Sequence, residues 1–374
     1  MNILYLADPN SVHDIRWINF FAERGVNCYM IVRERHVRGE YPRLDERIQV
    51  VGAIRDPSTI RPIRVVAQLL KIKTFIETFR IDLLHILYAE PNALWANARS
   101  YFGCPIVVTT RGSDVLRTIP MFFDNKSLLG KAVAWQYRRA FRYADTITCT
   151  STAQQEQVQR LTVETPVVIV RTGVDFRLVE REERHVAESL GIRTPFILMP
   201  RKMEPLYDHA FTLDAISLLP EHVRNKFAFV FLNADTPQRL YYRKIVDKAS
   251  GIQARFHFIP SLSHEDLFCL YKQASLVIMN PRSDGSPVSA MEAMACKVPV
   301  ILPPLPYDSD LFSQIFSFTR WTPDALKTTI ETVLSTPEAE LHEMLDNQYH
   351  RIHLEGNTEV QLKKVLQIYH DLFL

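Results

Sequence analysis

Short apolar runs alternate with amphipathic stretches throughout the first half of the chain. The amphipathic stretches have apolar residues at helical spacing and include Asp14–Arg24, Val65–Phe79 and Lys131–Tyr143. The apolar runs predict strands at Asn2–Ala7, Cys28–Val32, Leu83–Ile86, Ile106–Thr110, Thr146–Thr150 and Val167–Val170. Buried strands separated by helices indicate a parallel sheet with helices on both faces.

The pattern pauses at Gly173-Val174-Asp175 and then begins again. The second series of runs predicts strands at Phe196–Met199, Phe227–Leu232, Ala254–Ile259, Leu276–Met279 and Val298–Leu302. We therefore expect an α/β protein with two doubly wound, Rossmann-like domains, residues 1–175 and 176–357. A last helix, 358–374, fits either domain, and one alternative is that it crosses back to the first. Ligands of such sheets bind beyond the carboxyl ends of the strands, so we expect the site in a central cleft that the two domains face.

Composition narrows the class of protein. The chain has 374 residues, of which 47% are hydrophobic and 23% are charged, the balance of a globular enzyme. Its five cysteines are scattered through apolar stretches, which favours reduced thiols in a cytoplasmic protein over a disulfide framework. Met1 leads directly into an apolar run without a signal-peptide pattern, and no run approaches about 18 apolar residues, so we expect neither a signal peptide nor a membrane span. No Gly-x-Gly-x-x-Gly, P-loop or Cys/His metal spacing occurs, so we expect no dinucleotide cofactor and no metal.

The segment with the clearest chemistry is residues 276–300, LVIMNPRSDGSPVSAMEAMACKVPV. It predicts a buried strand, a polar loop and then a helix from about Pro287 to Cys296. Gly285 and Ser286 leave the backbone free to approach a ligand, and the helix N-terminus favours a phosphate. Asp284 lies at the mouth of the loop, and Glu292 lies about one and a half turns into the helix. Without further context, an ordinary strand–loop–helix with a capping Asp and a surface Glu is an equal alternative.

This segment resembles the donor-binding motif of the family 4 retaining glycosyltransferases, which have the GT-B architecture of two Rossmann-like domains. The chain has Asp284, seven residues, Glu292 and then Ala293-Met294-Ala295-Cys296-Lys297-Val298-Pro299-Val300. Other stretches are similar to the family as well, and the resemblance covers nearly the whole chain. They are Ile3–His13 with Arg16-Trp17, Arg111–Leu116, Ala144-Asp145, Gly173–Asp175, and Pro200-Arg201 with Pro205-Leu206-Tyr207.

The resemblance implies a nucleotide-sugar donor site without a metal. Glu292 would bind the ribose hydroxyls, and Arg201 would neutralise the departing diphosphate. The donor sugar would face Asp284 and the backbone around Gly285, Ser286, Pro287 and Val288. Ser289 and nearby helix amides would face the pyrophosphate, and the backbone around Ile259, Pro260 and Ser261 would edge the base.

The chain departs from the family pattern at four positions. The first motif carboxylate is Asp284 instead of Glu, and Leu206 stands where the family often has a lysine. Lys202 could replace that lysine, although a solvated lysine is an equal alternative. Arg111 stands where many members have a histidine and could bind an anionic donor or acceptor group. Lys297 replaces a helix-ending glycine, which costs about 1 kcal/mol if the backbone is left-handed there.

On the acceptor side we expect Asn10, Ser11 and His13 after the first strand, and His85 and Tyr88 after a later one. The alternatives are a helix N-cap for Ser11 and a packed strand-end position for His85. Asp308-Ser309-Asp310 is similar to the metal-binding Asp-x-Asp of another glycosyltransferase fold, but it follows a Pro-rich stretch, and we favour no metal role.

The first half of the chain carries a net positive charge and the second half a net negative charge. Segments Arg61–Arg80 and Lys126–Arg142 combine basic residues with apolar ones. Either they contact an anionic membrane surface, or they are helices with solvated basic faces. Nucleic-acid binding is not expected, because no recognition motif accompanies the basic residues.

These features predict a retaining glycosyltransferase that moves a sugar from a UDP- or GDP-type donor to a carbohydrate or lipid-linked acceptor. Such a protein would act in cell-surface glycan or polysaccharide biosynthesis, in the cytoplasm or at the inner face of the membrane. The alternatives are a nucleotide- or glycan-binding pseudoenzyme subunit and a GT-B sugar-nucleotide epimerase.

Overall fold

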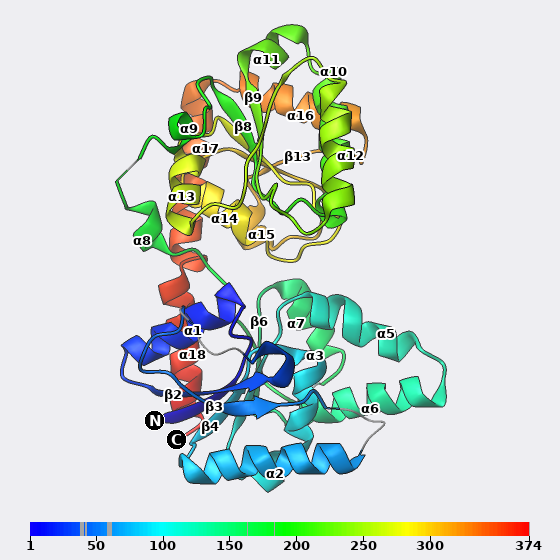
Figure 1. Ribbon diagram of the computed structural model, residues 1–374, viewed down its shortest axis with the longest axis vertical. Coiled ribbons are helices and arrows are strands. Elements are labelled where there is room, and N and C mark those ends of the chain that lie inside the picture. The colour runs from blue at the N-terminus through cyan, green and yellow to red at the C-terminus, as the bar shows by residue number, and fades with distance from the viewer. Residues whose placement is uncertain (38–40, 42, 58–61, 163, 183, 374) are drawn as a thin grey trace. The chain divides into compact units, whose positions relative to one another are not determined.

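The computed structural model describes residues 1–37, 41, 43–57, 62–162, 164–182 and 184–373, without the side chains of 62–64. Arg61, the first residue of one predicted basic segment, lies outside these residues. The chain forms two compact units: unit 1 is Met1–Thr172 with Gln361–Leu374, and unit 2 is Gly173–Val360 (Figure 1). Among the described residues, no helix combines the length and the apolar character that a membrane crossing requires.

Unit 1 is built on a seven-stranded parallel sheet with the order β3-β2-β1-β4-β5-β6-β7. Its strands are β1 Asn2–Leu6, β2 Asn27–Arg33, β3 Gln49–Ile54, β4 Leu83–Ile86, β5 Ile106–Thr109, β6 Thr146–Cys149 and β7 Val167–Ile169. The α-helices are α1 Val12–Glu23, α2 Pro62–Thr78, α3 Ala89–Asn92, α4 Arg99–Phe102, α5 Ile119–Asp124, α6 Leu128–Tyr143 and α7 Thr152–Gln159. Short 3-10 helices are η1 Glu34–His36 and η2 Ala93–Ala98, and η3 Asp114–Thr118 is a short π-helix.

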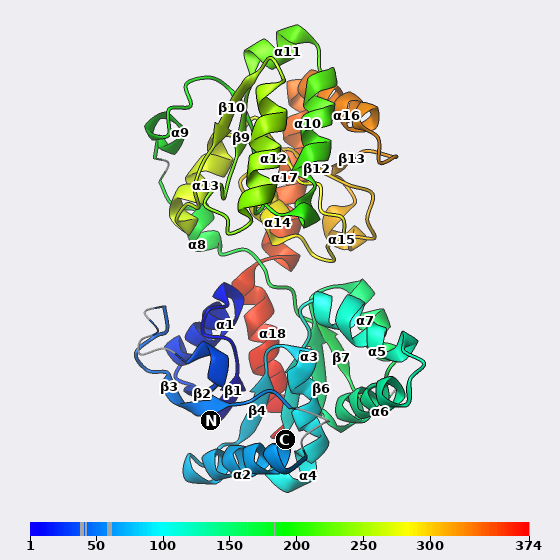
Figure 2. The same ribbon diagram turned by 45° about the vertical axis from the view of Figure 1, so that its right-hand side comes forward.

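Both faces of this sheet are covered, as the apolar runs predict. Along β1, Ile3 and Tyr5 pack into one apolar cluster, and Leu4 and Leu6 pack into another on the opposite face. The first cluster also contains apolar residues of α1 and of the last helix, α18 Thr358–Asp371, which lies against the sheet (Figure 2). Alternation of side chains across a strand explains how one apolar run serves two layers.

Unit 2 is built on a six-stranded parallel sheet with the order β10-β9-β8-β11-β12-β13. Its strands are β8 Phe196–Met199, β9 Ala228–Phe231, β10 Arg255–Phe258, β11 Leu276–Ile278, β12 Val300–Leu302 and β13 Phe316–Ser317. The helices are α8 Phe176–Val179, α9 Val186–Ser189, η4 Pro205–Tyr207, α10 His209–Leu218, α11 Glu221–Lys226, α12 Arg239–Ser250, α13 His264–Gln273, α14 Val288–Ala295, α15 Ser309–Phe312, α16 Pro323–Ser335 and α17 Glu338–Glu355. Two apolar clusters again fill the two faces of the sheet.

The predicted α/β class with two doubly wound sheets is confirmed. The apolar pattern missed β3 and β13, which both lie at the edge of a sheet. Their burial explains this: β3 exposes Gln49 and Val50, and β13 has only two residues, neither of them buried. Strand order reverses between β1 and β4 in unit 1 and between β8 and β11 in unit 2. Ligands of open α/β sheets bind beyond the carboxyl ends of the strands at such reversal points.

Candidate functional site

The loops after β8 and β11 meet at the reversal point of the unit 2 sheet. The loop after β8 carries Arg201, and the loop after β11 carries Asp284. The backbone N–H of Arg282 donates a hydrogen bond to the carbonyl of Leu206 at 2.9 Å, which ties one loop to the other. Two segments about eighty residues apart in the sequence thus form one surface at the carboxyl edge of the sheet.

Arg201 is the centre of this surface. Its Nη2 donates to the hydroxyl of Tyr207 at 2.8 Å and to Asp284 Oδ2 at 3.2 Å, and its Nη1 donates to Ser289 Oγ at 3.4 Å. The guanidinium carbon also lies 4.3 Å from the centroid of the Tyr207 ring. Burial disfavours the charge, but Tyr207 and Asp284 more than offset this effect, and the pKa of Arg201 is raised. The guanidinium is therefore a fixed, charged group of the kind that stabilises a departing phosphate.

Asp284 shares its two carboxylate oxygens between Arg201 and its own loop. Oδ2 receives the guanidinium, and Oδ1 accepts the backbone N–H of Ser286 at 3.2 Å. Burial raises the pKa of Asp284, and Arg201 and the loop amides oppose that rise. The shorter side chain thus reaches the arginine and leaves little of the carboxylate exposed.

Helix α14 begins beside this ion pair. Its N-cap is Pro287, so the helix begins within one residue of the predicted position. Pro287 makes no side-chain capping hydrogen bond. The first N–H groups of a helix that lack a cap favour an anion. The hydroxyl of Ser286 is buried and has no hydrogen-bond partner among the described residues. Gly285, Ser286, Val288 and Ser289 therefore present the polar groups that a phosphate or sugar requires.

Glu292 lies one turn further along α14 and is only 4% exposed. Its Oε1 is 3.6 Å from Nε2 of His264, at the start of α13. Burial, and then the nearby Glu292, raise the pKa of Tyr271, which is fully buried on α13. A carboxylate this deeply buried is seldom kept without a function or a strong partner.

The loop after β10 contains the predicted base-edging residues Ile259 and Pro260. Both peptide groups of Ile259 are used within the unit, since its N–H donates to Phe231 at 2.8 Å and its carbonyl accepts from Ala234 at 3.0 Å. Ser261, which follows Pro260, donates to Asp235 through both its N–H and its hydroxyl, each at 2.8 Å. The backbone of Ile259 is therefore less available to a base than that of Pro260.

Two residues of this surface were missed from the sequence. Tyr207 comes directly after Leu206 and holds Arg201, whereas Leu206 and Lys202 are exposed. Tyr307, in the loop after β12, has a buried hydroxyl with no partner among the described residues. Burial and the charge of Asp284 raise the pKa of Tyr307, and Arg201 opposes that rise. The motif contains neither tyrosine, so only a contact across loops identifies them.

In unit 1, Arg111 follows β5 and is nearly buried. Its Nη2 donates to Asp14 Oδ1 at 3.2 Å, its Nε donates to the carbonyl of Leu87 at 3.3 Å, and its guanidinium lies 4.4 Å from the ring of Trp17. Burial lowers the pKa of Arg111, and Asp14 opposes that shift. Nη1 has no hydrogen-bond partner in the described part of the chain. The predicted role in binding an anion therefore depends on this one nitrogen.

The other acceptor-side residues lie at the same edge of the unit 1 sheet, on loops or, for His13, in the first turn of α1. Ser11 caps α1 by accepting the N–H of Asp14 at 3.2 Å, which is the helix N-cap that the sequence offered as an alternative. Asn10 is exposed and its amide groups donate to Asp8, while His13 is half-buried. The hydroxyl of Tyr88 lies 3.1 Å from that of Ser113.

His85 corrects our expectation of an acceptor-side residue. It is fully buried, its Nδ1 is 2.5 Å from the hydroxyl of Tyr369, and its Nε2 is 2.7 Å from that of Thr109. Burial lowers the pKa of His85 to about 3, so the ring is neutral. Both nitrogens are used inside the core, where the ring joins α18 to the sheet, and this leaves no group for an acceptor.

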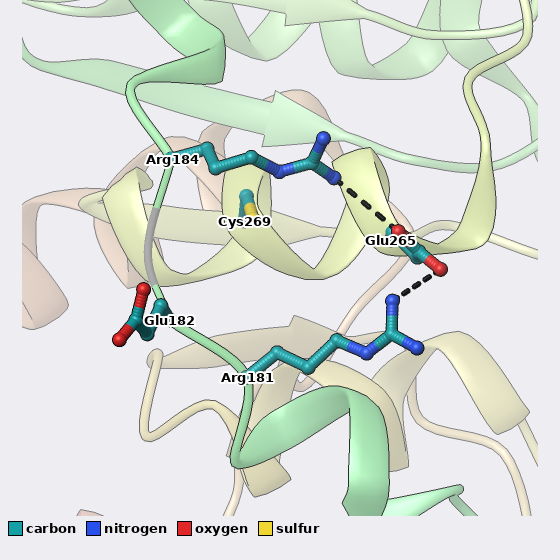
Figure 3. A pocket seen from close by; sticks show the side chains of 5 residues that line it. All are labelled: Arg181, Glu182, Arg184, Glu265 and Cys269. Atoms are coloured by element: carbon teal, nitrogen blue, oxygen red, sulfur yellow. Dashed lines mark ion pairs between the residues drawn. The ribbon is translucent and has the colours of Figure 1, made fainter.

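A separate hollow of about 320 Å³ lies in unit 2 beside α13. Figure 3 shows Arg181 and Arg184 pointing toward Glu265, with Cys269 on the helix between them. Arg184 pairs with Glu265 at 3.6 Å and with Asp266 at 3.0 Å, and Arg181 also pairs with Glu265. Because these charges are already compensated, the hollow does not offer an anion site. Among the described residues, no group of three or more His, Cys, Asp or Glu side chains is placed to hold a metal.

Comparison with known proteins agrees with this architecture. Residues 2–151 match the family model "Glycosyl transferase 4-like", and residues 180–351 match "Glycosyl transferases group 1". The fold and the loops at its sheet edges define a GT-B protein of two Rossmann-like units. The chain belongs to the family 4, group 1 glycosyltransferases.

Individual relatives are more distant. The chain is similar to the D-inositol 3-phosphate glycosyltransferases of Mycobacterium tuberculosis and Mycobacterium bovis, at 30% identity over 136 residues. That match spans 36% of this chain and 28% of the length of those relatives.

Solved structures share the fold at low identity. A glycosyltransferase from Rickettsia africae has a TM-score of 0.78 at 15% identity, covering 100% of this chain and 98% of the other. Anabaena HepE in complex with UDP and glucose has a TM-score of 0.75 at 16% identity, covering 99% and 100%. Sucrose-phosphate synthase from Thermosynechococcus elongatus has a TM-score of 0.74 at 16% identity, covering 100% and 99%.

Proposed function

We propose that this protein transfers a sugar from a UDP- or GDP-type donor to a carbohydrate or lipid-linked acceptor, with retention at the anomeric carbon. The observation that carries the proposal is the fixed guanidinium of Arg201, held beside Asp284 and the start of α14 at the reversal point of the sheet. The likeness to HepE, whose structure contains UDP and glucose, supports the choice of donor class. We assign the reaction to cell-surface glycan or polysaccharide biosynthesis.

The chemistry assigned to these residues follows from the charge that develops during transfer. As the bond from the anomeric carbon to the diphosphate breaks, negative charge grows on the leaving oxygen. Arg201, Ser289 and the first amides of α14 stabilise that charge without a metal ion. The acceptor oxygen approaches on the leaving-group face, bonds to the anomeric carbon, and passes its proton to the departing phosphate oxygen.

The other groups of unit 2 are assigned by position. Glu292 binds the ribose hydroxyls, and Asp284 with the backbone of Gly285–Val288 faces the sugar. Pro260 and the loop around it edge the base. Lys202 is exposed, so we assign it a contact with the outer phosphate at most.

For the acceptor we propose the loops at the carboxyl edge of the unit 1 sheet. Asn10, Ser11, His13, Tyr88 and the largely buried Arg111 supply their polar groups. We also propose that the protein works in the cytoplasm, at the inner face of the membrane, which it contacts through helix α6. Exposed Leu128, Leu129 and Trp135 share that helix with Lys131 and Arg142.

The test is nucleotide binding and donor turnover by the full chain. A thermal-shift screen with UDP-, GDP- and ADP-sugars should give one stabilising base class, since a ligand well above its Kd raises stability by several kcal/mol. Glu292→Gln should weaken binding of that nucleotide about 10-fold or more, because a buried carboxylate no longer accepts the ribose hydroxyls. Glu340→Gln, at an exposed position of α17, is the matched control. Unchanged affinity and turnover in Glu292→Gln would contradict the proposal.

A nucleotide-binding pseudoenzyme is the second candidate, because Asp284 already compensates Arg201 and Leu206 adds no charge. It predicts nucleotide binding without turnover of any donor across an acceptor panel.

A further inference from the structure

Tyr207 lies in the loop after β8, close to Arg201, and the proposed function assigns it no role. It ends the short helix η4, and its side chain is half-buried. It meets Arg201 in two ways at once: the hydroxyl accepts a hydrogen bond from Nη2 at 2.8 Å, and the guanidinium lies 4.3 Å from the ring centroid. These two contacts restrict both the position of the guanidinium and the tilt of its plane.

The hydrogen bond to Arg201 also directs the proton of the hydroxyl. A tyrosine hydroxyl that accepts an N–H still has one O–H to donate. No described residue accepts that O–H in a recorded hydrogen bond. The tyrosine oxygen that carries this O–H also accepts the hydrogen bond from Arg201. A group that accepts the O–H therefore lies beside any anion that Arg201 binds.

The neighbouring charges explain why such a group is needed. The preceding residue is Leu206, which is 40% exposed and supplies no cation. Arg201 itself is drawn toward Asp284 at 3.2 Å, whose negative charge competes with a bound diphosphate. If Tyr207 were absent, the remaining side-chain hydrogen bonds of Arg201 would be those to Asp284 and Ser289 among the described residues.

We propose that Tyr207 positions Arg201 and donates its O–H to the nucleoside-linked diphosphate, as a neutral donor beside this guanidinium. This inference rests on the proposed function, since it concerns the same donor site. It narrows that function, because it adds a tyrosine hydroxyl to the groups already assigned to the diphosphate.

The test compares Tyr207→Phe and Tyr207→Leu with the wild type, with Tyr242→Phe on α12 as the matched control. Affinities are measured by calorimetry for the nucleoside diphosphate and the nucleoside monophosphate of the base that the screen identifies. Tyr207→Phe keeps the ring and loses the hydroxyl. It should weaken diphosphate binding and lower kcat about 10- to 100-fold, the range for a lost hydrogen bond to a charged group, while monophosphate affinity and the unfolding midpoint stay unchanged.

Tyr207→Leu also removes the ring and should lose more of the diphosphate affinity than Tyr207→Phe. The inference is overturned if Tyr207→Phe binds the diphosphate and turns over donor like the wild type. It is also overturned if mono- and diphosphate affinities fall equally, because the tyrosine then only shapes the loop. A wild type that binds neither nucleotide would overturn the proposed function itself, a result that differs from both of these.

Discussion

At the scale of single residues, charge compensation is the main feature of the loops that follow β8 and β11. Arg201 and Asp284 lie 3.2 Å apart and are both largely buried, so each reduces the cost of burying the other. Burial raises the pKa of Asp284, and Arg201 opposes that rise. In the proposed function, the pair therefore sets how strongly the arginine attracts a diphosphate.

Asp284→Asn should separate binding from transfer. The neutral amide keeps the size of the side chain but no longer competes for Arg201, so we expect nucleoside diphosphate to bind about 3- to 10-fold more tightly. Turnover should fall about 10-fold or more, because the sugar loses a charged hydrogen-bond acceptor. Calorimetry and a donor-turnover assay measure the two effects. Asp247→Asn, exposed on α12, makes the same change of charge elsewhere. Weaker diphosphate binding in Asp284→Asn would contradict this account.

At the scale of elements, two backbone positions govern how the segments of unit 2 join. Lys297 ends α14 with a φ of +55°, so the residue in place of a helix-ending glycine does adopt the left-handed conformation. Its Nζ pairs with Asp346 of α17 at 2.6 Å, a contact that glycine could not make. Gly173 has a φ of +74°, and the next residue, Val174, forms a bridge with Asn357 just before α18. At position 173 a side chain is also excluded by crowding, because a Cβ there would lie 2.7 Å from the backbone of Thr358.

Gly173→Ala and Gly191→Ala form a pair that separates backbone strain from crowding. Both positions are left-handed, but a Cβ at Gly191 meets no atom within 4 Å. Gly191→Ala should lower the free energy of unfolding by about 1 kcal/mol, the cost of left-handed backbone alone. Gly173→Ala should lower it by about 3 kcal/mol or more, because Thr358 must also move. Urea denaturation of the two variants measures the difference, and equal losses would show that the close approach is relaxed in solution.

At the scale of the whole molecule, the chain divides its charge and its apolar surface unevenly between its two halves. The first half is net positive, and its helix α6 exposes Leu128, Leu129 and Trp135 along with basic residues. Leu128 is 86% exposed and Leu129 is 56% exposed, so two adjacent large apolar side chains at the start of α6 face solvent. The combination favours an anionic membrane surface, to which basic residues are attracted while apolar side chains insert.

Vesicle binding tests this surface. The protein should co-sediment with vesicles that contain anionic phospholipid, bind much less to neutral vesicles, and dissociate as salt is raised. The double change Leu128→Glu and Leu129→Glu should weaken binding about 10-fold or more, through lost apolar burial and added repulsion. Leu354→Glu, an exposed leucine on α17 of unit 2, is the control. Equal binding to neutral and anionic vesicles would argue against the proposal.

The sequence alone determined the features that depend on neighbours along the chain. Apolar runs located most strands because a parallel strand is buried on both faces. Spacing put Asp284 and Glu292 in one loop and helix, with the start of α14 within a residue of its expected place. The edge strands β3 and β13 escaped the same reasoning because they are only partly buried.

Only the tertiary structure decided which side chains act together. Arg201 and Asp284 meet because β8 and β11 are neighbours in the sheet, although 83 positions separate the two residues. His85 lies near the end of strand β4, as a site residue could, yet α18 covers it and Tyr369 contacts one of its ring nitrogens. Tyr207 lies in a stretch that resembles the family, but the sequence assigned it no role, and only its contact with the guanidinium of Arg201 identifies one. Strand pattern is a local property, whereas burial and charge compensation depend on segments that only folding brings together.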